Sequence, residues 1–239
     1  MPPPPIPHEA DPVVLLSNKS RRAAGLVAGV TVWLAVATGC MMTPISASEA
    51  NPLRIVTFGT SLTARGGWQE PLAAGLERCL AMPVEVLTVA KSGANSDWGV
   101  EAIDQVIAMK PQFVTVEFAA NDAALHRGMW LSRSQSNMRT IVRRLQDALP
   151  GVKIILMTMN PLHGPRALVR PFLGTYYDTY QALSKELGVG FIDHRAVWNG
   201  LTAGELKEAI PDGAHPIASK AAPLIVPAMI RAIGGDRCP

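Results

Sequence analysis

The chain has 239 residues, of which 48% are apolar, and this is enough for one globular domain with a buried core. Its 22 basic and 19 acidic residues give a formal net charge of +3, and both signs are mixed along the chain. A nucleic-acid-binding protein needs a concentrated basic patch or stripe, and none is visible. We therefore expect no nucleic-acid partner.

The first fifty residues differ in composition from the rest and predict an export signal. Residues 1–12 are rich in proline, and Lys19, Arg21 and Arg22 precede residues 23–42, which contain no charged side chain. A basic segment followed by an apolar one is typical of a secretory signal. The apolar centre, residues 26–37, is shorter than the ~20 apolar residues of a spanning helix, so a retained membrane anchor is the second interpretation.

The end of this segment allows two kinds of processing. Ala37-Thr38-Gly39-Cys40 resembles a bacterial lipobox, with alanine in place of the usual leucine, and predicts a lipid on Cys40. The alternative is ordinary cleavage after Ala50. Either route predicts an exported protein that is periplasmic, secreted or attached to a membrane, with residues 1–50 as signal and linker and residues 51–239 as the folded domain.

Cys79 and Cys238 remain once Cys40 is assigned to the signal segment. Thiols outside the reducing interior of the cell tend to pair. We hypothesise that these two form one disulfide, which would connect the C-terminal tail to the first long helix. The alternative is two unpaired cysteines.

Beyond the linker, short apolar runs alternate with longer stretches of helical spacing. The runs are rich in Val, Ile and Phe and predict five buried strands: Leu53–Phe58, Val84–Ala90, Phe113–Phe118, Val152–Met159 and Val189–Asp193. Five stretches between and after them predict helices: Trp68–Ala81, Val100–Met109, Ser132–Leu149, Phe172–Leu187 and Ile217–Ile233. This alternation predicts a three-layer α/β domain with a parallel sheet and helices on both faces.

Polar motifs directly follow the predicted strands, where ligands of such sheets bind. Gly59-Thr60-Ser61 follows the first strand and places a hydroxyl at the sheet edge; its alternative interpretation is a simple polar turn. Asp212-Gly213-Ala214-His215 precedes the last predicted helix and can supply an imidazole with a carboxylate to orient it. A turn with a capping histidine is the alternative there.

Two further motifs supply hydrogen-bond donors at the same edge. Gly93 follows the second strand and Asn121-Asp122 follows the third. The amides of Ser61 and Gly93 and the side-chain amide of Asn121 could stabilise the negative charge of an acyl-transfer transition state. Taken singly, Gly93 also fits a loop and Asn121 a turn or helix cap.

These four blocks, in this order, resemble the SGNH hydrolase superfamily, which includes the GDSL esterases and lipases, and the likeness spans roughly residues 53–233. The resemblance implies a flavodoxin-like α/β/α sandwich with a five-stranded parallel sheet. It also implies a nucleophile at Ser61, oxyanion donors at Ser61, Gly93 and Asn121, a general base at His215 and its partner at Asp212. Two positions depart from the usual pattern: Thr60 replaces a common aspartate, and Ala119 replaces a glycine.

Other residues are weaker candidates for chemistry. His126, His163 and His194 could each be proposed as the base, but none has the acid partner that His215 has three residues away. No spacing of histidines, cysteines and acids predicts a metal site, and no glycine-rich loop with a lysine predicts nucleotide binding. We expect no cofactor. Trp98 and Trp130 are expected to be buried in packing, with a role at the rim of the site as the alternative.

The sequence therefore predicts an exported serine esterase that hydrolyses carboxylic esters through an acyl-enzyme. The loops after the strands have few apolar residues, which favours short acyl groups such as acetate, on a small molecule or a carbohydrate. An acyltransferase, a lysophospholipase and a thioesterase of the same superfamily are the alternatives within this chemistry. An envelope protein that binds glycan without turnover is the alternative from a different class.

Overall fold

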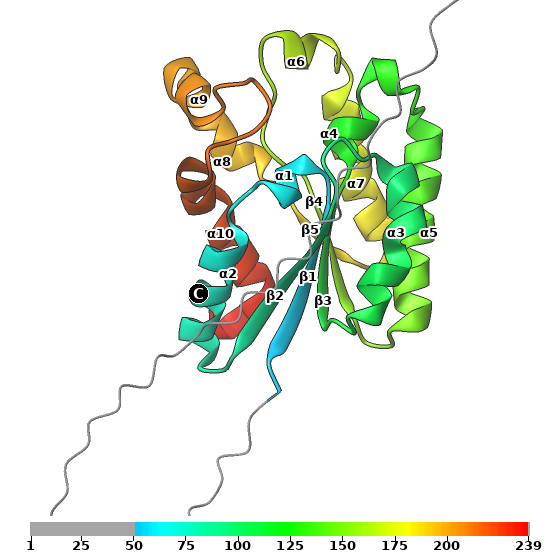
Figure 1. The fold of residues 1–239 in the computed structure, drawn as a ribbon, viewed down its shortest axis with the longest axis vertical. Helices are drawn as coiled ribbons and strands as arrows, with labels where there is room; N and C mark the ends of the chain where they lie inside the picture. The colour runs from blue at the N-terminus through cyan, green and yellow to red at the C-terminus, as the bar shows by residue number, and fades with distance from the viewer. Residues whose placement is uncertain (1–50, 239) are drawn as a thin grey trace, which may run out of the picture.

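The computed structural model describes residues 51–238, which form a five-stranded parallel sheet covered by helices on both faces (Figure 1). The strands are β1 (Leu53–Gly59), β2 (Val84–Ala90), β3 (Phe113–Glu117), β4 (Lys153–Met157) and β5 (Gly190–Ile192). Their order is β2-β1-β3-β4-β5, and every neighbouring pair is parallel. This is the strand order of flavodoxin-like folds, so the predicted fold class is confirmed. The predicted export signal and Cys40 lie outside the described residues.

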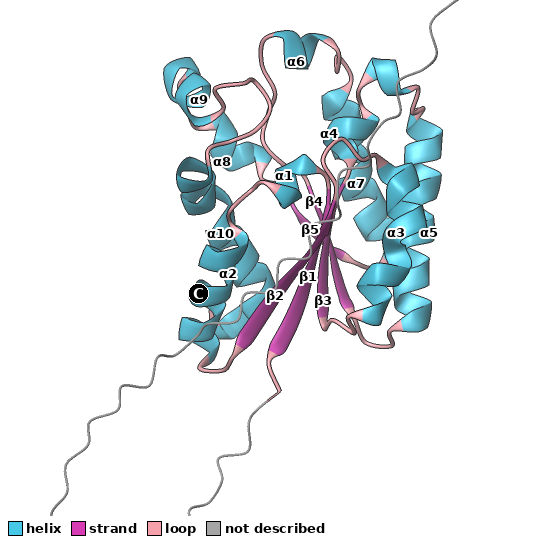
Figure 2. Cartoon of the chain, viewed as in Figure 1, coloured by secondary structure: helices cyan, strands magenta, loops and turns pink. Residues whose placement is uncertain are grey.

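Five long helices form the two outer layers (Figure 2). On one face lie α2 (Gln69–Leu80) and α10 (Ala218–Gly234), and on the other lie α3 (Ser96–Ala108), α5 (Leu131–Ala148) and α7 (Leu173–Leu187). Each was predicted from its helical spacing. None of the helices described is both long and apolar enough to cross a membrane.

One long helix begins earlier than its sequence spacing predicts. The predicted start of α3 is Val100, whereas the helix begins at Ser96. The Asn95 side chain accepts a hydrogen bond from the backbone N–H of Trp98 and so caps the helix. This earlier start places the first turn of α3 directly after the loop that contains Gly93.

Several short helices lie in the loops and were not predicted. They are α1 (Ser61–Ala64), α4 (Ala119–Asp122), α6 (Pro165–Leu168), α8 (Arg195–Asn199) and α9 (Ala203–Ala209), with 3-10 turns η1 (Leu125–Arg127) and η2 (Gly235–Arg237). In Figure 1, α1, α4 and α6 lie at the end of the molecule where the strands finish. The carboxyl edge of the sheet is therefore where short elements present polar side chains.

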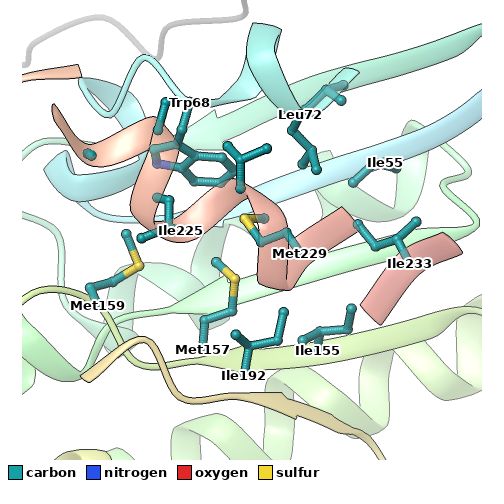
Figure 3. Packing of buried hydrophobic residues seen from close by; sticks show 14 of the residues in the cluster. Ile55, Trp68, Leu72, Ile155, Met157, Met159, Ile192, Ile225, Met229 and Ile233 are labelled. Carbon is teal, nitrogen blue, oxygen red and sulfur yellow. The ribbon is translucent and has the colours of Figure 1, made fainter. Parts of the chain in front are cut away.

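Two apolar clusters, one on each face, hold the helices to the sheet. Figure 3 shows the cluster beneath α2 and α10, where Trp68 and Leu72 pack with Ile225 and Met229 over Ile155 of β4. The opposite cluster joins α3, α5 and α7 to the sheet around Val56, Val114 and Ile141. Because both faces of the sheet are buried, its strands are rich in Val, Ile, Leu and Phe, which is why they were visible in the sequence.

Cys79 of α2 and Cys238 near the C-terminus form a disulfide, as hypothesised. The bond closes a sequence separation of 159 residues. A cross-link over so long a loop lowers the entropy of the unfolded chain and so stabilises the fold. It attaches the tail that follows α10 to the helix against which α10 packs.

Candidate active site

The turn after β1 places Ser61 at the carboxyl edge of the sheet. Gly59 ends the strand, Thr60 is the N-cap of α1, and Ser61 is the first residue of that helix. The Thr60 side-chain oxygen accepts a hydrogen bond from the backbone N–H of Leu62, 3.2 Å away, which fixes the first turn. Ser61 is 8% exposed and lines a cavity at this edge.

A buried carboxylate, Glu117 at the end of β3, lies beneath this turn. Its Oε1 accepts hydrogen bonds from the Thr60 backbone N–H at 2.6 Å, the Thr60 hydroxyl at 3.0 Å and the Thr63 hydroxyl at 2.7 Å. A side chain on Gly59 would collide with this carboxyl group, so only glycine fits there. Glu117 was not among the residues proposed from the sequence.

Glu117 also gives a physical reason for threonine at position 60. The Thr60 hydroxyl donates to Glu117, whereas an ionised aspartate at the same position could only accept and would place a second negative charge against it. Burial raises the pKa of Glu117 to about 7, and the hydrogen bonds from Thr60 and Thr63 limit this rise. Threonine at position 60 therefore suits the buried carboxyl group beneath it.

The titration of Glu117 predicts a specific pH dependence of stability. Its pKa is about 7 in the folded protein and near 4.5 when exposed, so the folded state holds the proton more tightly. Protonated Glu117 therefore contributes to the free energy of unfolding. This contribution is fully present below pH 4.5 and is lost as the pH rises through about 7. Over this interval the wild type should lose on the order of 3 kcal/mol of unfolding free energy relative to Glu117→Gln.

Denaturant unfolding of both proteins at several pH values measures this difference. Glu101→Gln, which removes an exposed carboxyl group of α3, is the control and should follow the wild-type curve. Parallel curves for the wild type and Glu117→Gln would show that Glu117 does not titrate as expected.

Three side chains proposed from the sequence form one hydrogen-bonded series. Ser61 Oγ lies 2.8 Å from His215 Nε2, and His215 Nδ1 lies 2.6 Å from Asp212 Oδ2. Ser61 comes from α1, and the other two come from the loop before α10. The fold therefore brings together groups that are 154 residues apart in the chain.

The loop that carries His215 is held in shape by Asp212 itself. Asp212 Oδ1 accepts hydrogen bonds from the backbone N–H groups of Ala214, at 2.9 Å, and His215, at 2.7 Å. Gly213 between them has φ of +79°, which favours glycine. Partial burial raises the pKa of Asp212. The hydrogen bonds from the backbone and ring of His215 and from the backbone of Ala214 have the larger effect, and they hold the pKa of Asp212 below its ordinary value. Asp212 is thus kept ionised beside the imidazole.

Neighbouring polar residues fix this loop from outside. Asn160 Nδ2 donates to the carbonyl of Ala214 at 2.9 Å, and the backbone N–H of His163 donates to the carbonyl of Gly213 at 3.0 Å. His163 Nε2 also lies 2.7 Å from the carbonyl oxygen of Ile210. His163, weighed above as a base, therefore contacts the backbone of the loop that presents His215.

The two other predicted donors line the same cavity as Ser61 and His215. Gly93 has φ of +77°, again the region that favours glycine. Asn121 donates from Nδ2 to the carbonyl of Ala94 at 2.7 Å, and its Oδ1 accepts from Arg170 Nη2 at 3.4 Å. These two contacts fix the orientation of the Asn121 side-chain amide, with Nδ2 toward Ala94 and Oδ1 toward Arg170. They use one of the two Nδ2 hydrogens. The second Nδ2 hydrogen has no acceptor among the described residues.

The remaining candidates of the sequence lie elsewhere. His194 is buried and neither ring nitrogen has a hydrogen-bond partner among the described residues; burial lowers its pKa to about 4, although nearby Asp193 raises it. His126 is exposed in η1. Trp98 packs against Phe58 and Phe118, as expected, but it is only half-buried. The prediction for Trp130 is wrong: it is 78% exposed, because it precedes α5 on the surface instead of facing the core.

The cavity has a volume of about 170 Å³ and is also lined by arginines, which sequence reasoning did not single out. They are Arg65, Arg127, Arg166 and Arg170. Within residues 51–238, no three His, Cys, Asp or Glu side chains gather as they would to hold a metal ion. The chemical groups at the site are therefore a hydroxyl, an imidazole with its carboxylate, amide donors and guanidinium groups.

Comparison with known proteins gives one family for this chain. The model of the GDSL-like lipase/acylhydrolase family matches residues 57–219, a span that includes Ser61, Asn121 and His215. A GDSL esterase/lipase of Arabidopsis thaliana is 30% identical over 137 residues, 50% of this chain and 55% of that protein. A Bos taurus homolog of isoamyl acetate-hydrolyzing esterase 1 is 31% identical over 124 residues, 46% of this chain and 48% of that protein. The chain thus matches about half the length of these curated relatives.

Solved structures share the fold at lower identity. An acetylxylan esterase from Geobacillus stearothermophilus superposes with a TM-score of 0.66 at 19% identity, covering 78% of this chain and 96% of that one. A GDSL-like lipase from Bacteroides thetaiotaomicron has a TM-score of 0.60 at 18% identity, covering 76% of this chain and 88% of that one. At such identities the likeness shows the common α/β/α architecture.

Proposed function

The chain belongs to the GDSL-like lipase/acylhydrolase family, and from that premise we propose that it is a serine esterase acting on carboxylic esters. The observation that carries the proposal is the hydrogen-bonded series from Ser61 through His215 to Asp212. A serine hydroxyl needs a base to become a nucleophile, and a base needs an orienting partner. Ser61 and His215 line one cavity, and Asp212 contacts the ring nitrogen of His215 that does not face Ser61.

In the proposed mechanism, His215 Nε2 accepts the proton of Ser61 as Oγ attacks the ester carbonyl. Asp212 holds the proton on Nδ1, so that Nε2 is free to accept, and stabilises the imidazolium that forms. The tetrahedral intermediate collapses when His215 returns the proton to the leaving alcohol, and the acyl group stays on Ser61. Water, deprotonated by His215, then attacks the acyl-enzyme and releases the acid while Ser61 regains its proton.

The negative charge of the tetrahedral intermediate needs donors that are in place before the reaction. We assign this role to the backbone N–H groups of Ser61 and Gly93 and to Asn121 Nδ2. Asn121 is suited to it because the carbonyl of Ala94 and the guanidinium of Arg170 fix its amide. A donor held in this way needs no reorganisation during the reaction.

Asn121→Ala should therefore lower kcat for 4-nitrophenyl acetate by about 100-fold or more. Release of 4-nitrophenol at saturating substrate measures the effect. Asn199→Ala, which changes an exposed asparagine at the end of α8, is the matched control and should retain the wild-type rate. A kcat of Asn121→Ala within twofold of the wild type would remove Asn121 from the oxyanion site.

The proposed substrates are esters of short acids such as acetate. A cavity of about 170 Å³ has room for a small acyl group, and the Bos taurus relative is named for an acetate ester. A second candidate is a longer acyl chain, as in a lysophospholipase, because Leu125, Leu168 and Phe172 are exposed on loops at the same end of the sheet. Rates on 4-nitrophenyl esters from acetate to laurate separate the two, with a maximum at acetate supporting the first.

The same assay separates hydrolysis from the remaining alternatives. An acyltransferase would release 4-nitrophenol faster when a sugar acceptor is added, and the acyl group would appear on the sugar. A glycan-binding protein without catalysis would turn over none of the esters. The absence of turnover across the whole series would therefore reject the esterase proposal.

We also propose that the protein is exported, with residues 51–239 as the hydrolase domain. The disulfide between Cys79 and Cys238 supports this, because such bonds persist mainly outside the reducing interior of the cell. Growth with a radioactive fatty acid tests lipidation of Cys40. An unlabelled mature protein would leave ordinary cleavage or a retained anchor.

A further inference from the structure

Four arginines surround the cavity that contains Ser61 and His215, and no carboxylate is among its lining residues. They come from four separate segments: the end of α1, the 3-10 turn η1, α6 and the loop after α6. Elsewhere, Arg54, Arg133, Arg139, Arg144 and Arg195 are each paired with an acid, whereas the exposed Arg78, Arg143, Arg231 and Arg237 have no ion pair among the described residues. None of the four cavity arginines has such a partner among the described residues.

The two inner arginines are held by neutral groups, so their charge is not compensated. Arg170 is 8% exposed and donates from Nε to the carbonyl of Ala120 at 2.6 Å and from Nη1 to the carbonyl of Arg166 at 3.0 Å. Arg127 donates from Nη1 to the carbonyl of Gly93, and its buried Nε has no hydrogen-bond partner among the described residues. Carbonyl oxygens orient a guanidinium but leave its positive charge in place.

The arginines also act unfavourably on one another. Burial lowers the pKa of Arg170, and the positive charges of Arg127 and Arg166 lower it further. Burial lowers the pKa of Arg127 as well, and only the nearby Asp122 opposes this. The carboxyl of Asp122 is itself engaged by the Ser96 N–H and the Ser134 hydroxyl. Removing cations from water without a counter-charge costs free energy, and an anionic ligand would offset this cost.

The two outer arginines are free to reach such a ligand. Arg65 and Arg166 are exposed, and their guanidinium groups make no hydrogen bond within residues 51–238. A guanidinium presents planar, forked N–H donors that match a carboxylate or a phosphate. The outer pair thus supplies unused donors, and the inner pair supplies positive charge from the buried Arg170 and the half-buried Arg127.

We propose that the cavity takes esters that carry a negatively charged group, a carboxylate or a phosphate, in their acid or alcohol part. Arg65 and Arg166 bind this group, and Arg127 and Arg170 supply the positive field beneath it. The inference rests on the proposed esterase function and adds to it the charge of the substrate.

Matched pairs of esters that differ only in charge test this proposal. In 4-carboxyphenyl acetate the charge is in the alcohol, and 4-carbamoylphenyl acetate is its neutral match. In 4-nitrophenyl hydrogen adipate the charge is in the acid, and methyl 4-nitrophenyl adipate is its neutral match; the adipate chain is long enough that its carboxylate does not readily attack its own ester. A third probe, 4-acetoxyphenyl phosphate, carries a phosphate where the first probe carries a carboxylate. Comparing these two charged probes shows which anion the site prefers. At least one charged ester should exceed its match in kcat/KM by about tenfold or more.

The double variant Arg65→Gln with Arg166→Gln should lower that charged-to-neutral ratio by about tenfold. It removes the two exposed charges and keeps all three backbone carbonyls that accept hydrogen bonds from Arg127 and Arg170. Arg143→Gln, an exposed arginine of α5 without an ion pair among the described residues, is the control and should retain the ratio. Raising the ionic strength from about 0.01 M to about 1 M should also lower the ratio in the wild type. The proposal fails if every charged ester reacts no faster than its match, or if the double variant leaves the ratio unchanged.

A binding measurement separates failure of this proposal from failure of the esterase function. Calorimetric titration of Ser61→Ala with 4-carboxyphenyl acetate and with its carbamoyl match needs no turnover. Tighter binding of the charged probe supports the anion site even if no ester is hydrolysed, in which case only the esterase function fails. Equal binding of the two probes, together with turnover of the neutral esters, overturns the anion site alone.

Discussion

Replacing Ser61 with alanine should lower kcat for 4-nitrophenyl acetate by about 10⁴-fold or more. The variant lacks the oxygen that lies 2.8 Å from His215 Nε2, so no acyl-enzyme can form. The fold should survive, because the hydrogen bonds that fix the turn come from Thr60 and Thr63 to Glu117 and do not involve the Ser61 hydroxyl. Release of 4-nitrophenol by the variant measures the loss of kcat, and thermal unfolding measures whether the fold survives.

The matched control is Ser136→Ala, which removes an exposed hydroxyl on α5 and should leave kcat and the melting temperature near their wild-type values. A Ser61→Ala protein that is folded and retains more than a tenth of the wild-type kcat would show that another group performs the reaction.

Asp212→Asn should have an effect of similar size, a loss of roughly 10⁴-fold in kcat. The asparagine oxygen can still accept from the backbone of Ala214 and His215, so the loop keeps its shape. Its NH2 group then faces His215 Nδ1, at the place where Oδ2 now lies 2.6 Å away. The His215 ring must then adopt the tautomer with its proton on Nε2. In that tautomer Nε2 can no longer accept the proton of Ser61.

Steady-state rates of this variant at several pH values measure the loss. Asp104→Asn, which changes an exposed carboxylate of α3, serves as the control and should retain the wild-type kcat. Loss of less than tenfold in Asp212→Asn would mean that His215 does not depend on this carboxylate for its tautomer.

The fold could be predicted because both faces of the sheet are buried. Each strand is therefore mostly apolar, and the polar motifs begin where the strands end, as after Gly59 and after Ala90. Ser61, Asp212 and His215 were identifiable because two short motifs contain them, although their distance from one another was not. The short helices were less visible, since four or five residues are too few to show a period. α9 is an exception with a missed signal: Thr202 and Glu205 form a capping box at its start.

Glu117 and the cavity arginines were missed for different reasons. Glu117 is the only acid in the run predicted as the strand Phe113–Phe118, and this is a signal that could have been used, because a buried carboxylate needs donors close by. Arg65, Arg127 and Arg166 gave no signal, since they lie on separate surface segments and only the folded chain brings them around one cavity. Sequence spacing contains no information on that convergence.

The sequence argument for a short acyl group also needs revision. It rested on few apolar residues in the loops after the strands, whereas Leu125, Leu168 and Phe172 are exposed there. The support for a short acyl group is now the size of the cavity. The chain-length series is therefore the assay that decides between acetate and longer acids.

Labelling with a fluorophosphonate, followed by mass spectrometric mapping of the modified residue, identifies the nucleophile without any knowledge of the substrate. This reagent phosphonylates a serine only where a base and oxyanion donors activate it. We predict one modified residue, Ser61, with labelling lost in Ser61→Ala and strongly slowed in His215→Ala. A folded protein that stays unlabelled, or that carries the label on a different residue, would contradict it.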